Sequence, residues 1–365
     1  MNKEMIPELK ELIDVVHYQP AISIITPLLT PAELNNDVFY SLKIAVDKVE
    51  KELRQNYPEN KITAVIQKLK SVVKTIKVNT AKKSVAIFVS PVFEKVVYLD
   101  IAVEEKIIID ESFEIRDLVY SKKQLHNYLV LLFSAKESRI YLGNTESFVK
   151  LVSSKAASAM ELIRDEPERV ANFSDTTEKK EILMDKFLHH IDTELSMVLS
   201  AYQLPLFVIG TEKMLGHFKS VTKHKEAVVN YIHGNYDEAG FNVLKELLQP
   251  YIKSWQKSIQ LELLKLLDAA AGAKKIATGM KAVWHEAMNN NGKLLVVEKN
   301  YMYAAQHGSK DDLIYEAVEP FNKFSSIKDA VDDVIERVLE KGGDVEFVDK
   351  GMLSSYNQIA LIQYY

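Results

Sequence analysis

The chain has 365 residues, no cysteine and a net charge of −5, with 51 acidic side chains against 46 lysines and arginines. This length predicts two or three domains, and the charge argues against a generic nucleic-acid binder. The absence of cysteine excludes disulfides, thiolate zinc sites and a thiol nucleophile. No apolar run approaches the ~20 residues of a membrane-spanning helix, and the first residues lack the apolar core of a signal peptide. We therefore expect a cytoplasmic protein that does not bind membranes.

The first part of the chain, residues 1–124, mixes predicted helices and strands. Apolar residues recur at helical spacing in three segments, and four short runs rich in Val and Ile have the length of strands. The last of these runs, 106–109, is expected to continue as a strand toward Leu118. The expected helices are 8–17, 36–56 and 62–76, and the expected strands are 21–25, 85–89, 96–101 and 106–109. This pattern predicts an α+β domain.

The middle part, residues 125–271, begins with a continuous apolar run, Tyr128–Phe133, which is typical of a strand covered on both faces. A meander of three strands followed by crossovers predicts a mixed sheet with helices packed against it. The segment 154–180 is expected to form a short helix and a loop. The expected strands are 128–133, 139–142, 148–152 and 204–209, with 226–232 as a strand or short helix, and the expected helices are 174–202, 212–221 and 241–271, the last kinked or interrupted at Pro250.

The last part, residues 272–365, alternates between helical and strand patterns. Gly342-Gly343 follows a strongly periodic helix, where glycine commonly ends a helix. The expected helices are 274–289 and 327–339, and the expected strands are 293–297, 345–348 and 359–363. This order predicts a small α/β sandwich.

Lysines are unevenly distributed along the chain. Residues 61–83 contain seven lysines and no acid, so this stretch can meet phosphates although the total charge is negative. The alternative is an ordinary solvated helix face. The lysines that we expect to contact RNA phosphates are Lys68, Lys70, Lys74, Lys77, Lys82 and Lys83, with Lys213, Lys219, Lys223 and Lys225 as a second group.

No pattern of residues indicates an enzyme, a metal site or a cofactor. Adjacent helical histidines point about 100° apart and cannot easily share a metal, so the histidines are expected at the surface or in helix caps. Paired acids are expected at helix starts, where the macrodipole favours them. Phosphate-binding GxxxxGK[ST] and GxGxxG loops and the GxSxG elbow are missing, which leaves a nucleotide cofactor without support. The residues concerned are His189-His190, His217, His224, Asp311-Asp312 and Asp332-Asp333.

Four passages, taken in order, resemble a known family. They are AISIITP (21–27), SVAIFVSP (84–91), YLVLLFSAKESRIYLGN (128–144) and KAVWHEAMNNNGKLLVVEKNY (281–301). Their order resembles that of the bacterial relatives of the archaeo-eukaryotic class I release factors and of Pelota. The resemblance implies an α/β and α+β multidomain chain with a ribonuclease-H-like middle domain. It also implies a C-terminal domain similar to kink-turn-binding ribosomal proteins, and a ribosome or structured RNA as partner.

The resemblance does not extend to the catalytic motif of release factors. In that family a GGQ tripeptide on a middle-domain loop serves hydrolysis of peptidyl-tRNA, and the corresponding segment here, 163–180, contains no glycine. The only Gly-Gly, Gly342-Gly343, is followed by Asp344, and the codon-reading NIKS motif is also absent. Pelota likewise lacks GGQ and binds stalled or idle ribosomes without hydrolysis, so the scaffold can work as a binder.

The sequence therefore favours a non-hydrolytic, translation-associated factor that binds ribosomes or structured RNA, in rescue or dormancy. One alternative is a hydrolase with a different chemistry on the loop 164–180, where Ser174 and several acids precede a long helix. Another is a protein-binding scaffold without a ribosomal role, which the negative net charge would suit. Fold alone does not decide among them.

Overall fold

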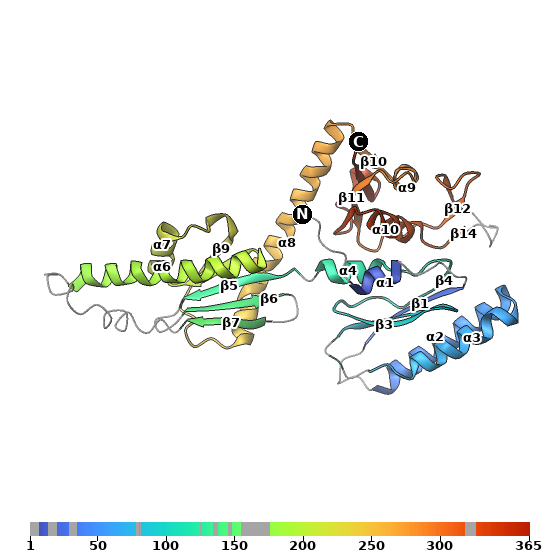
Figure 1. Ribbon diagram of the computed structural model, residues 1–365, viewed down its shortest axis with the longest axis horizontal. Coiled ribbons are helices and arrows are strands. Elements are labelled where there is room, and N and C mark those ends of the chain that lie inside the picture. The colour runs from blue at the N-terminus through green and yellow to red at the C-terminus, as the bar shows by residue number, and fades with distance from the viewer. Residues whose placement is uncertain are drawn as a thin grey trace. The chain divides into compact units, whose positions relative to one another are not determined.

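The computed structural model describes residues 7–13, 20–28, 35–77, 80, 82–124, 126–133, 138–144, 148–154, 176–317 and 326–365. The fold is mixed α/β with several sheets, which confirms the predicted class. The chain divides into two units (Figure 1). The first unit contains residues 1–124 and 260–365, and the second contains residues 125–259. The division into three domains at 124/125 and 271/272 remains a proposal.

The N-terminal part of the first unit is built on an antiparallel sheet of order β3-β2-β1-β4. The strands are β1 (Ala21–Pro27), β2 (Ser84–Val89), β3 (Glu94–Leu99) and β4 (Lys106–Asp110), and the helices are α1 (Pro7–Ile13), α2 (Asn35–Asn56), α3 (Glu59–Val73) and α4 (Arg116–Gln124). Strand β2 is buried at every position because alternate residues enter two cores. Ile87 packs with α2 and α3, whereas Phe88 faces the core that includes α1 and α4.

Helix α4 corrects one expectation, because the strand β4 does not continue toward Leu118. It ends at Asp110, and α4 begins six residues later at Arg116. The segment is rich in acids, and its apolar Ile115, Leu118 and Val119 were compatible with a strand. Their spacing of three and four residues instead places them on one helix face in the shared core.

The C-terminal part of the first unit has a sheet of order β10-β16-β11-β15, in which β11 and β15 pair in parallel. Helices α9 and α10 cover one face, and Leu263 and Leu267 of α8 pack against the other. The segment between β11 and α10 forms a separate small sheet of order β13-β12-β14. The elements are β10 (Ile276–Thr278), α9 (Met280–Met288), β11 (Gly292–Glu298), β12 (Ala305–His307), β13 (Ile314–Glu316), β14 (Ser326–Ile327), α10 (Ala330–Glu340), β15 (Asp344–Val348), η2 (Ser354–Tyr356) and β16 (Ile359–Gln363).

Two helices in this part begin later in the chain than the sequence predicts. The helix expected from residue 274 starts at Met280, because 276–278 pair with β16 as the edge strand β10. The helix expected from Ile327 starts at Ala330, because Ile327 belongs to β14. In both cases strand pairing with a distant segment overrides the local helical pattern.

The second unit has a five-stranded mixed sheet of order β7-β6-β5-β8-β9. Strands β5, β6 and β7 form the antiparallel meander, and β8 and β9 join it in parallel, which confirms the mixed sheet. The elements are β5 (Tyr128–Phe133), β6 (Ser138–Gly143), β7 (Phe148–Ser154), α6 (Thr176–Tyr202), β8 (Leu206–Gly210), α7 (Glu212–Val221), η1 (Lys225–Ala227), β9 (Val228–His233) and α8 (Phe241–Gly272).

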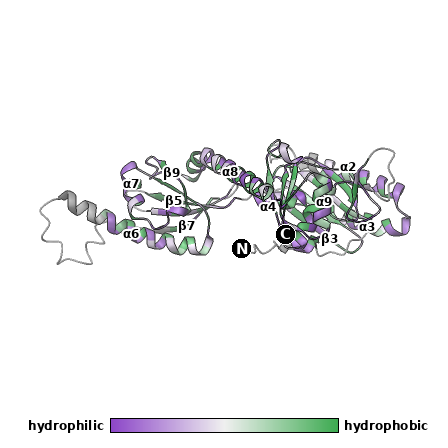
Figure 2. Ribbon diagram, turned by 90° about the horizontal axis from the view of Figure 1, so that it is seen from above, coloured by the Kyte–Doolittle hydropathy of each residue, from purple (hydrophilic) through white to green (hydrophobic). Residues whose placement is uncertain are grey.

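Strand β5 is covered on both faces, as its apolar run predicts. Leu129 and Leu131 pack with α6 and α7, and Val130 and Leu132 pack with α8. Helix α8 continues through Pro250 without interruption. Figure 2 shows green, hydrophobic residues gathered in the strands and purple, hydrophilic residues along helices such as α6 and α7. Within the described parts of the chain, no helix is long and apolar enough to cross a membrane.

Candidate nucleic-acid interface

Three of the six lysines predicted near the end of α3 are engaged within the chain. The Lys68 Nζ donates hydrogen bonds to the carbonyl oxygens of Ser90 and Pro91, at 3.3 and 3.0 Å. The Lys70 ammonium pairs with Glu50, and Lys82 pairs with the buried Asp100. These contacts neutralise or occupy the ammonium groups, so their charge is not available in full to a phosphate.

The other three lysines of this group, Lys74, Lys77 and Lys83, are exposed. Lys74 is the C-cap of α3 and Lys77 follows one turn later, where its backbone N–H donates to the Tyr98 hydroxyl at 2.7 Å. In the described part of the chain no acidic side chain pairs with these three ammonium groups. The basic strip expected from the sequence therefore offers fewer available ammonium groups than its number of lysines suggests.

The second predicted group lies on one continuous segment, α7 to η1 of the second unit. Leu215 and Phe218 turn the inner face of α7 into the core, which leaves the polar residues of the helix outside. All four lysines of the group are exposed, and among the described residues none has an acidic partner; they are Lys213, Lys219, Lys223 and Lys225. We call this set the α7 lysine surface.

A buried polar contact fixes the turn in the middle of the α7 lysine surface. Asp192 of α6 is only 5% exposed and accepts a hydrogen bond from the Thr222 hydroxyl at 2.6 Å. Its second oxygen accepts the Lys223 N–H at 3.3 Å, and the Thr222 oxygen accepts the His224 N–H at 3.1 Å. Because buried carboxylates require such partners, this contact holds the backbone from which Lys223 and Lys225 project.

Lys219 lies over an aromatic ring. Its Nζ is 4.4 Å from the ring centroid of Tyr231, in the edge strand β9. A cation above an aromatic face is held in place by the ring quadrupole, yet its outer side stays open to an anion. The arrangement can bind phosphate groups through point charges that salt will screen.

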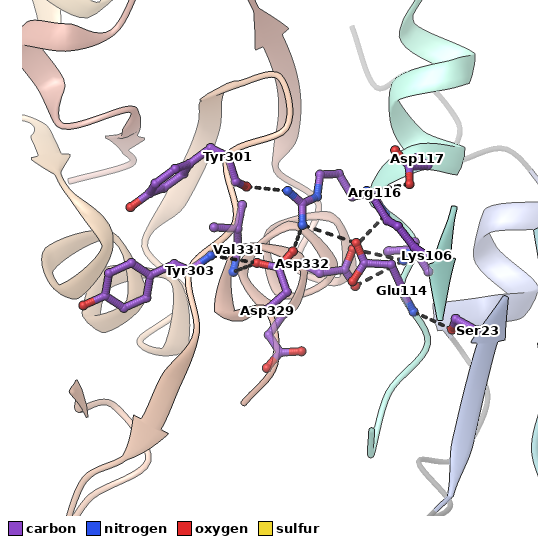
Figure 3. Close-up of polar contacts among 12 residues, drawn as sticks. Ser23, Lys106, Glu114, Arg116, Asp117, Tyr301, Tyr303, Asp329, Val331 and Asp332 are labelled. Carbon is purple, nitrogen blue, oxygen red and sulfur yellow. Dashed lines mark hydrogen bonds and ion pairs between the residues drawn. The ribbon is translucent and has the colours of Figure 1, made fainter. Parts of the chain in front are cut away.

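A buried ionic cluster in the first unit was not expected from the sequence (Figure 3). Arg116, at the start of α4, is 2% exposed and its guanidinium pairs with Asp329 and with Glu114 and donates to the Tyr301 carbonyl. Asp332 of α10 accepts the Ile115 N–H at 3.0 Å and the Arg116 N–H at 2.7 Å. Together these residues join the N-terminal part of the unit to its C-terminal part.

The structure confirms one of the two acidic pairs at a helix start and corrects the other. Asp332 and Asp333 lie in the first turn of α10, and Asp332 also accepts hydrogen bonds at the N-terminus of α4, 216 residues earlier in the chain. The cap of α10 is Asp329, which accepts the Val331 N–H. Asp311 and Asp312 lie in a turn between β12 and β13 and not at a helix start, and Asp312 pairs with His285 at 3.0 Å.

Acids accumulate beside this cluster with few compensating cations. Burial, reinforced by Asp110, raises the pKa of Asp333 to about 7, although Ser112 donates a hydrogen bond to it. Burial and the neighbouring Asp333 raise the pKa of Glu336 to about 8. Burial also raises the pKa of Asp332 and of Glu114. Asp333 and Glu336 therefore hold protons near neutral pH.

The histidines do not gather at any site in the described residues. His189 and His190 are exposed on α6, His217 lies 3.7 Å from Asp185, and His224 precedes η1. No group of three His, Asp or Glu residues that could hold a metal ion is found among the described residues. Most of the segment 164–180, the candidate hydrolytic loop, lies outside the described residues, as does Ser174.

Residues 127–291 match the model of bacterial archaeo-eukaryotic release factor family 3. No curated protein matches the chain. Among solved structures, the archaeal termination factor aRF1 is 12% identical over 98% of this chain and 97% of that chain, with a TM-score of 0.25. A model of ribosome-bound archaeal Pelota and ABCE1 is 11% identical over 100% of this chain and 95% of that chain, with a TM-score of 0.44. Dom34 of S. cerevisiae is 12% identical over 79% and 75%, with a TM-score of 0.40.

Proposed function

Since this chain is a release-factor-like, Pelota-like protein, we propose that it is a translation-associated factor that binds the ribosome through its RNA and hydrolyses nothing. The observation that carries the proposal is the α7 lysine surface. It lies within the family match and presents four exposed ammonium groups, for which the described residues supply no acidic partner. Ribosomal RNA is the densest source of phosphates that such a factor meets, and ammonium groups bind phosphates without any sequence requirement.

The chemistry of the chain supports binding over catalysis. A GGQ tripeptide does not occur anywhere in the sequence. Lysines 74, 77 and 83 of the first unit add a second exposed basic surface. A role in the rescue of stalled ribosomes or in dormancy fits a factor that binds without cleaving peptidyl-tRNA. We propose this role on the resemblance to Pelota.

Co-sedimentation with purified bacterial ribosomes across a salt series tests the proposal. The variant changes Lys213, Lys219, Lys223 and Lys225 to Gln. A matched control changes four exposed lysines of α8 and of the turn that follows it, Lys253, Lys257, Lys265 and Lys274, to Gln. Wild type should bind saturably and lose affinity as salt rises, and the α7 variant should bind at least tenfold more weakly. The control has the same net charge and should bind like wild type.

Two results would contradict the proposal. If wild type does not sediment with ribosomes at low salt, the chain is not a ribosome-binding factor and a protein partner becomes the better hypothesis. If both four-lysine variants weaken binding equally, the contact is a nonspecific charge effect and not a property of the α7 lysine surface.

A further inference from the structure

The first two turns of α2 carry large apolar side chains on the outside. Phe39 is 45% exposed, Tyr40 is 66% exposed and Ile44 is 38% exposed. On a helix, residues four apart are neighbours, so Tyr40 lies beside Ile44 and Phe39 lies beside Lys43. Leu42 and Ala45, on the side of these turns that faces the sheet, are buried. The outer aromatic residues are therefore not part of that core.

The lysine end of α3 lies at the same end of the helical pair. Helices α2 and α3 run antiparallel across one face of the sheet and are joined at Tyr57-Pro58 (Figure 1). An ion pair between Glu50 and Lys70 joins the two helices. Lys74 is the C-cap of α3 and Lys77 follows it, so both lie at the end of α3 that, in an antiparallel pair, is next to the beginning of α2, where Phe39 and Tyr40 are.

The charge of this helical pair is opposite to that of the whole protein. Residues 35–83 contain eleven lysines and arginines and five acids, a net charge of +6 in a chain of net charge −5. Three of the five acids already have cations: Glu50 pairs with Arg54 and Lys70, Glu52 with Lys328, and Glu59 with Arg54. Among the described residues, no acid pairs with the Lys43, Lys74 or Lys77 ammonium groups.

We propose that this end of the α2–α3 pair binds unpaired nucleotides of RNA, with Phe39 and Tyr40 stacking on bases and Lys43, Lys74 and Lys77 contacting the phosphates. Exposed aromatic rings interleaved with lysines are the combination by which proteins hold single strands, because every base offers a face for stacking. A duplex keeps its bases stacked on each other and offers none. The inference rests on the proposed function and specifies which form of RNA this surface recognises.

Charge favours RNA over a protein partner at this surface. An apolar protein interface places its charged residues at the rim and depletes lysine at the centre. Here Lys43 follows the two aromatic residues by one turn on α2, Lys74 and Lys77 lie at the end of the neighbouring helix, and the net charge of residues 35–83 is +6. A protein contact is nevertheless a distinct outcome of the test.

The test uses the full-length chain and fluorescein-labelled RNA of about 12 nucleotides, a length within the range that single-strand sites cover. Three probes are compared: an unpaired strand, the same strand with abasic positions and an equal number of phosphates, and a duplex of the strand with its complement. The variants are Phe39→Ala with Tyr40→Ala, the conservative Tyr40→Trp, and Tyr315→Ala with Tyr365→Ala. The last pair removes exposed aromatic residues elsewhere.

We expect the Phe39/Tyr40 double variant to bind the unpaired strand roughly tenfold to a hundredfold more weakly than wild type, the effect of losing base stacking. On the abasic strand and the duplex it should equal wild type. Tyr40→Trp should retain binding, and the Tyr315/Tyr365 variant should behave as wild type on all probes. Equal binding of the intact and abasic strands by wild type would overturn the inference.

The outcomes separate this inference from the proposed function. If wild type binds ribosomes but treats the three RNA probes alike, the ribosome proposal stands and the single-strand site is wrong. If the Phe39/Tyr40 variant loses ribosome binding while the RNA probes show no stacking effect, the surface contacts a ribosomal protein and the inference is overturned. If wild type binds neither ribosomes nor any RNA, both proposals fail.

Discussion

Charged residues in two regions of this protein face opposite ways. Around Arg116 the charges turn inward, each against an opposite charge or a backbone group, and they connect the two parts of the first unit. On the α7 lysine surface they turn outward and have no acidic partner among the described residues. The surroundings of a charge, and not its presence in the sequence, decide whether it stabilises the fold or is available to a partner.

The two arrangements also differ in how much each charge contributes to the free energy of unfolding. An ion in the low dielectric of the interior is costly to leave unpaired, whereas a surface ammonium is well hydrated and contributes little to stability. Substitutions in the inward region should therefore change stability. Those in the outward region should change binding alone.

The largest effect is expected for Arg116→Ala. Removing the guanidinium leaves the buried Asp329 and Glu114 without their cation, so the free energy of unfolding should fall by about 3–5 kcal/mol. Arg54→Ala is the matched control, because Arg54 pairs with Glu50 at the surface and its loss should change stability little. Urea unfolding measures both. Equal losses for the two variants would refute the distinction between inward and outward charges.

A smaller effect is expected at Asp192, which links the two kinds of region. Asp192→Ala leaves the Thr222 hydroxyl and the Lys223 N–H without their acceptor, which should lower stability by about 1–3 kcal/mol. It should also weaken ribosome binding severalfold at temperatures where the variant is fully folded, because Lys223 and Lys225 lose their fixed turn. Asp192→Asn keeps an oxygen acceptor and should restore most of the binding.

The control for Asp192 is Asp185→Ala, on the same helix. Asp185 is exposed and 3.7 Å from His217, so its removal should change neither stability nor ribosome binding measurably. If Asp192→Ala lowers stability but leaves ribosome affinity unchanged, the contact is structural only and does not position the α7 lysine surface.

The smallest effect is a pH dependence of the first unit. Asp333 and Glu336 have folded-state pKa values of about 7 and about 8, above the ordinary 3.8 and 4.5. The folded state keeps protons that the unfolded chain releases, so the free energy of unfolding should fall as the pH rises from about 4 to about 8. The melting temperature at pH 5.5 should exceed that at pH 8.5 by roughly 2–8 °C.

A double variant, Asp333→Asn with Glu336→Gln, isolates this contribution. Both amides stay uncharged, so the variant should lose much of the difference between pH 5.5 and 8.5 and should melt higher than wild type at pH 8.5. The groups that face these two side chains are Asp110, Glu111, Ser112, Glu114 and Glu340. An identical pH dependence in wild type and the double variant would assign the effect to other groups.

The sequence predicted those elements whose pattern is decided locally. The apolar run Tyr128–Phe133 predicted a buried strand, and the periodic stripes of α2, α3 and α10 placed those helices to within a few residues. Errors arose where a distant partner decides the structure. Residues 276–278 become a strand only because β16 pairs with them, and the two- and three-residue strands of the small sheet were missed for the same reason.

The candidate site shows the same limit. The ten lysines could be chosen from composition, but only the structure shows that Glu50 and Asp100 already pair with Lys70 and Lys82. The role of Asp332 was hidden because its hydrogen-bond donors lie 216 and 217 residues away. Phe39 and Tyr40 carried a signal that could have been recognised, since two adjacent aromatic residues at the start of an amphipathic helix cannot both face its core.

The most direct measurement compares two pairs of lysines from the same short stretch. Lys68→Gln with Lys70→Gln removes lysines whose ammonium groups already have partners in the chain, and Lys74→Gln with Lys77→Gln removes exposed lysines that no acid pairs with among the described residues. The change in net charge is the same, and ribosome affinity is measured for each across a salt series. The Lys74/Lys77 variant should bind more weakly, with the slope of log K against log salt reduced by roughly 1.4–1.8, and the Lys68/Lys70 variant should match wild type. Equal loss in both pairs, or in neither, would contradict the account.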